Sequence, residues 1–156
     1  MTAAARTRTS ALREAGDRGS GAGAVILFTL VFLSLTAFVV DGGLAISQRE
    51  RAADIAEEAA RYAAQDLDEE ALRDGESEYE APINYQNCGA RVAKFAAESG
   101  LSGGDLAASG CTGATAEYVE VEIQLTYSPI FSSIGGGAVT VHGEARAEPR
   151  VEAGNP

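Results

Sequence analysis

The sequence has few of the residues that build catalytic and metal sites. It contains no tryptophan, one histidine (His142), one methionine and two cysteines, and aromatic residues make up only 6%. No G-x-S-x-G, H-E-x-x-H or phosphate-cradling loop occurs. One histidine and two cysteines without a C-x-x-C do not make a closed zinc site. The sequence therefore predicts no enzymatic activity, no cofactor, no metal and no small-molecule substrate.

Positive charge is also scarce. The chain has 12 Lys and Arg against 23 Asp and Glu, which gives a net charge of −11 and a pI near 4.5. Nucleic-acid phosphates would be repelled by such a surface. We therefore expect no nucleic-acid partner, and we interpret the acidic residues as a solvated surface.

One long segment has no charge at all. Residues 19–40 read GSGAGAVILFTLVFLSLTAFVV, between Arg18 and Asp41. As a helix, these 22 residues would extend about 33 Å, enough to cross a hydrocarbon core of about 30 Å. The run predicts a transmembrane helix over residues 19–41, with membrane lipid as a partner.

The charges on either side of this run predict its orientation. Four arginines and two acidic residues precede it, whereas the other eight basic and 21 acidic residues follow it, for a net charge of about −13. Basic flanks resist translocation. We expect residues 1–18 to form a cytoplasmic tail, with the C-terminal part on the outer side of the cell membrane.

A cleaved secretory signal is the alternative interpretation. It would end near Gly43-Leu44-Ala45 and release a small disulfide-bonded secreted or surface protein, which could bind a ligand through Tyr79 and Tyr85. The apolar run is longer than the 7 to 15 residues of a signal core. This comparison favours a retained anchor.

Two patterns inside the run could pack against other helices. Gly19 and Gly23 have the GxxxG spacing that permits close helix contact in membranes. Phe28, Phe32 and Leu35 recur at helical spacing and offer a lateral packing stripe.

The next segment, residues 42–73, is predicted to be an amphipathic helix outside the membrane. Gly42 and Gly43 could break it from the anchor or only bend it. Its buried stripe is narrow because the residues at helical spacing are small. The stripe consists of Ala52, Ala56, Ala59, Ala60, Ala63 and Leu67.

Residues 74–148 are expected to form a small α+β head. We predict a surface loop over 74–87, a short helix over 88–99 and a loop over 101–115. Apolar residues then alternate over 119–127 and 139–147, which predicts an antiparallel β-hairpin whose apolar face covers the alanine stripe. Residues 149–156 are expected to form a flexible, frayed tail.

Cys88 and Cys111 both lie in the predicted outer part. An oxidising compartment favours one disulfide between them, closing a loop of about two dozen residues. The predicted fold class is thus α+β: a long N-terminal transmembrane and amphipathic helix, a short helix, an antiparallel β-hairpin and one disulfide.

Four short segments flank the apolar run or follow it closely: DRGS at 17–20, VDGG at 40–43, QRERAAD at 48–54 and EEAAR at 57–61. In this order they resemble the N-terminal region of TadE/TadG-like proteins of the bacterial Flp (tight adherence) pilus machinery. The closing segment VTVHGEARA at 139–147 is similar to the last strand of small members. The resemblance implies a non-enzymatic, minor pilin-like membrane protein that acts with other pilin-like or pilus-assembly membrane proteins.

The chain departs from that family pattern at one position. Processed prepilins carry a glutamate five residues after the cleavage-site glycine, but this position is Ala24 counted from Gly19 and Gly21 counted from Gly16. We therefore expect the N-terminal tail to be retained. The departure favours an assembly, base or tip role over that of the major shaft subunit.

Overall fold

The computed structural model describes residues 6–75, 82–101, 103–132 and 136–150, with side chains described from Gly21 onward. Four α-helices, one 3-10 helix and three strands occupy these residues. In chain order they are α1 (Arg6–Ala64), α2 (Glu69–Asp74), η1 (Tyr85–Asn87), α3 (Cys88–Glu98), α4 (Gly103–Ala108), β1 (Gly110–Ala114), β2 (Val119–Tyr127) and β3 (Val139–Ala147).

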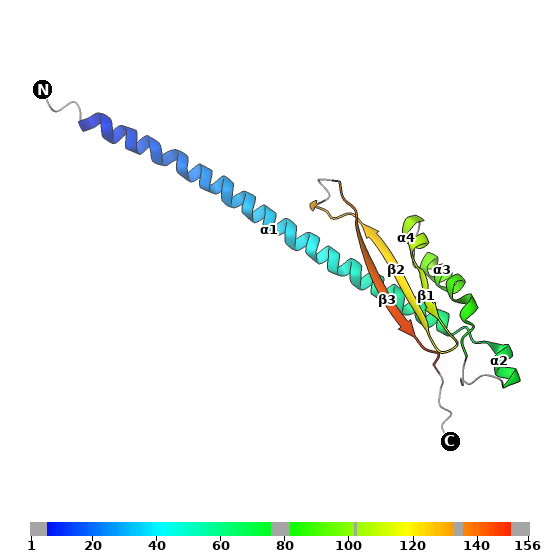
Figure 1. The fold of residues 1–156 in the computed structure, drawn as a ribbon. Helices are drawn as coiled ribbons and strands as arrows, with labels where there is room; N and C mark the ends of the chain where they lie inside the picture. Colours follow the sequence, from blue (N-terminus) through cyan, green and yellow to red (C-terminus); the bar gives the residue numbers. More distant parts are fainter. Residues whose placement is uncertain (1–5, 76–81, 102, 133–135, 151–156) are drawn as a thin grey trace, which may run out of the picture.

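Helix α1 is a rod of 59 residues, and β2, β3 and α3 pack against its C-terminal half (Figure 1). It begins at Arg6 and so includes most of the basic segment as well as the apolar run. It also continues through Gly42 and Gly43 without a break. Two glycines cost a helix about 2 kcal/mol relative to alanine, and the packing of the head against α1 offsets this cost.

The three strands form one antiparallel sheet in the order β1-β2-β3. In the β2–β3 hairpin, Ile123 lies opposite Gly143 and Val119 lies opposite Ala147. The predicted hairpin is therefore confirmed, as is the α+β class. The sequence analysis missed β1 because its sequence, GCTGA, has neither alternation nor large apolar residues.

The core lies between α1 and the sheet. Five apolar side chains from β2 and β3 point toward α1 and are buried: Val119, Val121, Ile123, Leu125 and Val141. From α1, five of the predicted stripe residues are at most 1% exposed: Ala52, Ala56, Ala59, Ala60 and Ala63. Small side chains on the helix let the sheet approach closely, and this close packing compensates for the scarcity of large apolar residues.

The predicted helix over 42–73 is too long, and Leu67 does not belong to its stripe. Helix α1 ends at Ala64, and Leu67 is 36% exposed and forms an isolated antiparallel bridge with Ile83. The next helix, α2, begins after Asp68, whose carboxylate accepts hydrogen bonds from the amides of Glu70 and Ala71. An aspartate in this position is a strong helix N-cap, so it starts a new helix and interrupts the first.

The predicted disulfide is confirmed: Cys88 at the start of α3 is bonded to Cys111 in β1. Helix α3 packs on the end of α1, where the rings of Tyr62 and Phe95 lie 5.7 Å apart and the Arg91 guanidinium stacks on Tyr62. The loop predicted over 101–115 is largely regular, since it contains α4 and β1. Within the predicted surface loop over 74–87, residues 76–81 lie outside the described residues, and η1 begins at Tyr85. Most of the predicted frayed tail, 151–156, also lies outside them.

Candidate functional site: the apolar helix and its junction with the head

The N-terminal half of α1 presents an uninterrupted apolar surface. Every position from Gly21 to Thr36 is exposed, and the ring of Phe28 has 71% of its surface accessible. The segment is long and apolar enough to cross a membrane, with a mean hydropathy of 2.5 over its best window. Exposed apolar surface of this extent is unfavourable in water and marks an interaction site.

The polar side chains within this surface are satisfied inside the helix. The hydroxyls of Thr29, Ser34 and Thr36 donate hydrogen bonds to the carbonyls of the residues four positions earlier, at 2.8 to 2.9 Å. A helix in lipid must satisfy its polar groups internally, because the hydrocarbon offers no partners. The segment therefore meets the hydrogen-bonding requirement of a membrane span.

The predicted lateral stripe lies on one side of this helix. Phe28, Phe32 and Leu35 line a shallow surface depression together with Thr29 and Val31. At 100° per residue, this side is opposite Ala37, which lies on the head's side of α1. A neighbouring helix could therefore contact the stripe without meeting the head.

The predicted GxxxG pair is less clearly placed. Gly23 has open space where a side chain would be. Gly19 lies in α1, before the residues whose side-chain surroundings are described. Helix contact through Gly19 and Gly23 stays a prediction.

Asp41 joins the apolar helix to the head. Its carboxylate accepts backbone hydrogen bonds from Ile130 at 2.9 Å, Phe131 at 3.2 Å and Ser132 at 2.7 Å, and a further bond from the Ser132 hydroxyl. These donors belong to the segment that follows β2, about 90 residues further along the chain. A single carboxylate directly after the apolar run thus fixes the tip of the hairpin to α1.

Little in the sequence indicates this junction. An acidic residue at the end of an apolar run ordinarily marks the point where a helix leaves the membrane, whereas the structure bonds Asp41 to a distant segment of its own chain. The signal in the sequence is an isolated acidic residue next to an apolar run.

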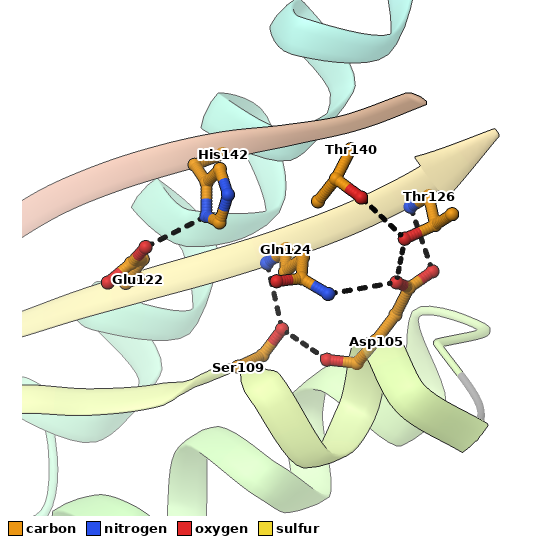
Figure 2. Close-up of polar contacts among 7 residues, drawn as sticks. All are labelled: Asp105, Ser109, Glu122, Gln124, Thr126, Thr140 and His142. Atoms are coloured by element: carbon orange, nitrogen blue, oxygen red, sulfur yellow. Dashed lines mark hydrogen bonds and ion pairs between the residues drawn. The ribbon is translucent and has the colours of Figure 1, made fainter. Parts of the chain in front are cut away.

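A polar network covers the sheet face that points away from α1 (Figure 2). Strand β1 pairs with β2 only as far as Glu122. The amides of Gln124 and Thr126, further along the same edge of β2, therefore need other acceptors. Ser109 accepts from the amide of Gln124 at 2.9 Å, and Asp105 accepts from the amide of Thr126 at 3.0 Å. Helix α4 therefore completes the strand edge with side chains, which protects it from pairing with other chains.

The carboxylate of Asp105 is the centre of this network. It also accepts hydrogen bonds from the side chains of Thr126, at 2.7 Å, and Gln124, at 3.5 Å. Desolvation acts to raise the pKa of Asp105, but the hydrogen bonds from Thr126 and Gln124 outweigh it and hold this pKa below its ordinary value. The ionised carboxylate is the form that holds α4 on β2.

Other polar and charged side chains on this face form partly exposed pairs. His142 Nδ1 lies 2.8 Å from Glu122 Oε1, and the Arg146 guanidinium stacks on Tyr118 and lies 3.6 Å from Glu120. Half-exposed pairs of this kind contribute little to stability. Within the part of the chain that the structure describes, no three metal-ligating side chains come together.

The remaining predicted residues divide between core and surface. The five buried stripe alanines lie under the sheet, so they cannot contact a partner without unfolding the head. Tyr85, one of the two tyrosines of the alternative ligand-binding hypothesis, is exposed on η1. Tyr79 lies outside the described residues.

The geometry defines a class of protein in which an exposed apolar helix continues directly into the helix that carries a small disulfide-bonded head. Comparison with known proteins agrees with this description. The protein-family model described as putative Flp pilus-assembly TadE/G-like matches residues 19–66, which include the apolar run and the whole head-bearing part of α1. The match suggests a role in pilus assembly and an anchor in a membrane. No curated protein and no solved structure matches the chain.

Proposed function

We propose that this protein is a non-enzymatic, single-pass membrane protein that aids assembly of a Flp-type pilus or a related secretion apparatus, as a minor pilin-like component. Residues 19–41 of α1 cross the bacterial cell membrane. The basic segment before them stays in the cytoplasm, and the acidic head lies outside, as the charge asymmetry favours.

The observation that carries the proposal is the position of the family match on the fold. Residues 19–66 include both the exposed apolar surface and the buried alanines on which the sheet packs. The segment that matches the family model is thus one helix with two proposed functions: its first part inserts into the membrane, and its second part supports the head. A soluble protein would have no use for the first of these.

The lateral stripe is the proposed contact with other pilus components. In lipid, helices associate through close packing and not through the hydrophobic effect, so shape along one side matters. Phe28, Phe32 and Leu35 provide such a side, away from the head. At 100° per residue Gly23 lies on the opposite side of the helix, where it leaves room for a separate helix contact.

The Asp41 junction argues against a cleaved signal. Cleavage after Ala45 would remove Asp41 and with it the four hydrogen bonds that hold the hairpin tip. Leu44 and Ala45, directly before the best cleavage position, are themselves partly covered. A signal peptidase would therefore discard part of the helix that contacts the head.

Deletion and complementation test the proposal in the bacterium that carries this chain. We expect loss of the protein to reduce surface pili and adhesion, and expect the full chain to restore both. A chain in which the stripe is replaced by alanines (Phe28→Ala, Phe32→Ala, Leu35→Ala) should insert but fail to restore piliation. Unchanged piliation and adhesion after deletion would contradict the proposal.

A matched control separates packing from insertion. Ile26, Leu30 and Leu33 lie on the other side of the same helix and are also well exposed, at 58 to 62% against 60 to 71% for the stripe. Their replacement by alanine removes a similar apolar area, so both triple variants should resist carbonate extraction equally. Only the variant with alanine at positions 28, 32 and 35 should fail to restore piliation.

A further inference from the structure

The tip of the hairpin is uncharged in an otherwise acidic head. Between Glu122 and Glu144 the sequence contains no Asp, Glu, Lys or Arg, although the chain as a whole has a net charge of −11. Two apolar side chains of this segment point into solvent: Ile130 is 62% exposed and Phe131 is 41% exposed. Exposed apolar side chains next to each other in an uncharged segment need an explanation.

The fold places these side chains beside the apolar helix. The bonds from Ile130, Phe131 and Ser132 to Asp41 hold the segment at the first residue after the apolar run. Ala37, one turn earlier on the same side of α1, is also partly covered, whereas its neighbours in the run are exposed. The hairpin tip therefore lies level with the end of the apolar run.

We propose that this tip is a second membrane contact, in which Ile130 and Phe131 insert into the interfacial region of the bilayer that α1 crosses. The inference rests on the proposed membrane anchor. Insertion of aromatic and apolar side chains to this depth lowers the free energy, and the small serine side chain can be accommodated there. The acceptor positions of Asp41 are filled by four donors, which lowers the cost of bringing its charge close to lipid.

Lipid fits this surface better than a protein partner does. Specific protein interfaces bury about 800 Å² on each side, far more than two side chains offer. The exposed surface of Phe38 and Val39, directly before the junction, continues the same apolar region along α1. A bilayer would cover the helix and the tip together, and the head would then be held at a fixed height above the membrane.

The absence of tryptophan from the chain makes a direct test possible. Phe131→Trp puts a unique fluorophore at the tip of the full-length protein, which is reconstituted into phosphatidylcholine–phosphatidylglycerol vesicles with or without brominated acyl chains. Phe28→Trp reports the anchor, and Tyr118→Trp reports the opposite end of the head. Circular dichroism and an intact Cys88–Cys111 disulfide verify that each variant is folded.

We expect brominated lipid to quench Phe131→Trp to an extent comparable with Phe28→Trp, and to leave Tyr118→Trp unaffected. Quenching at position 28 without quenching at 131 would overturn the membrane contact and leave the anchor intact. A shielded but unquenched tryptophan at 131, dependent on protein density in the vesicle, would indicate a protein partner and also overturn it. No quenching at position 28 would contradict the anchor itself.

A second variant tests the role of the junction. Combining Asp41→Ala with Phe131→Trp removes the acceptor for all four hydrogen bonds but keeps the reporter. The quenching at 131 should fall, because the tip is no longer held at the membrane. Equal quenching with and without Asp41 would show that the carboxylate does not position the tip.

Discussion

Gly143 of β3 lies directly against the backbone of Ala52 in α1. A Cβ atom at position 143 would collide with the carbonyl group of Ala52 and the amide nitrogen of Ala53. Strand and helix therefore meet backbone to backbone, which requires glycine on one side and alanine on the other. This contact explains how a chain with few large apolar residues still packs a core.

The first prediction concerns this contact. Gly143→Ala should destabilise the head by about 1 to 3 kcal/mol, since overpacking forces the backbones apart. Denaturant unfolding in micelles measures it, in a Tyr118→Trp background that reports the head. Gly110→Ala in β1 is the control, because a Cβ there meets open space. Equal stability of the two variants would contradict the close approach.

The second prediction concerns the disulfide. Replacing Cys88 and Cys111 together by serine should cost about 3 kcal/mol, the loop-entropy value for a closure of this length. The bond joins α3 to β1 and makes no contact with the apolar run, so the variant should still resist carbonate extraction. The same unfolding experiment, with and without reductant on the wild type, provides an independent measurement. A variant as stable as the oxidised protein would refute this account.

The third prediction concerns pH. The hydrogen bonds of Asp105 hold its pKa below the ordinary value of about 3.9, so the ionised form stabilises the folded head. That contribution is complete above the ordinary pKa and disappears as the pH falls through the lower, folded pKa. Asp105→Asn should therefore be less stable than wild type by about 1 kcal/mol at pH 7, a small value because the carboxylate is partly exposed.

Comparing the two proteins at several pH values tests the sign of this effect. The stability difference should stay constant from pH 7 to about pH 5 and shrink below about pH 4. Other carboxylates titrate in both proteins, so the difference isolates position 105. A stability difference between wild type and Asp105→Asn that increases on acidification would contradict the stabilising role of the ionised form.

The fourth prediction concerns the two sides of the apolar helix. Alanine at Phe28, Phe32 and Leu35 should weaken cross-linking of α1 to neighbouring membrane proteins in cells, whereas alanine at Ile26, Leu30 and Leu33 should not. A residue-specific photo-cross-linker at position 31, beside the stripe, provides the readout. Similar cross-linking in both variants would mean that the stripe has no special role in contacts.

The sequence predicted the elements that have a clear period. The alternation over 119–127 and 139–147 correctly predicted both long strands, and the alanine spacing correctly predicted the buried side of α1. The disulfide followed from there being only two cysteines. Each of these patterns reflects a direct requirement for burial or pairing, so the structure can be predicted from the residues of the segment itself.

Other features depend on contacts between distant segments and left little local trace. Helix α1 ends at Ala64 because Asp68 starts another helix, although the apolar spacing continues to Leu67. Helix α4 and β1 form from glycine-rich sequence because Asp105 and Ser109 meet unpaired amides of β2. The Asp41 junction likewise needed donors from about 90 residues away.

The intact mass of the protein that resists carbonate extraction is the most direct test of the central claim, that residues 19–41 stay in the membrane and carry the folded head. The account predicts a membrane-bound chain of about 16.1 kDa that retains the basic segment before Gly19. A chain beginning at Ser20 would show prepilin-type processing, against our expectation. A water-soluble chain beginning at Ile46 would contradict the claim itself.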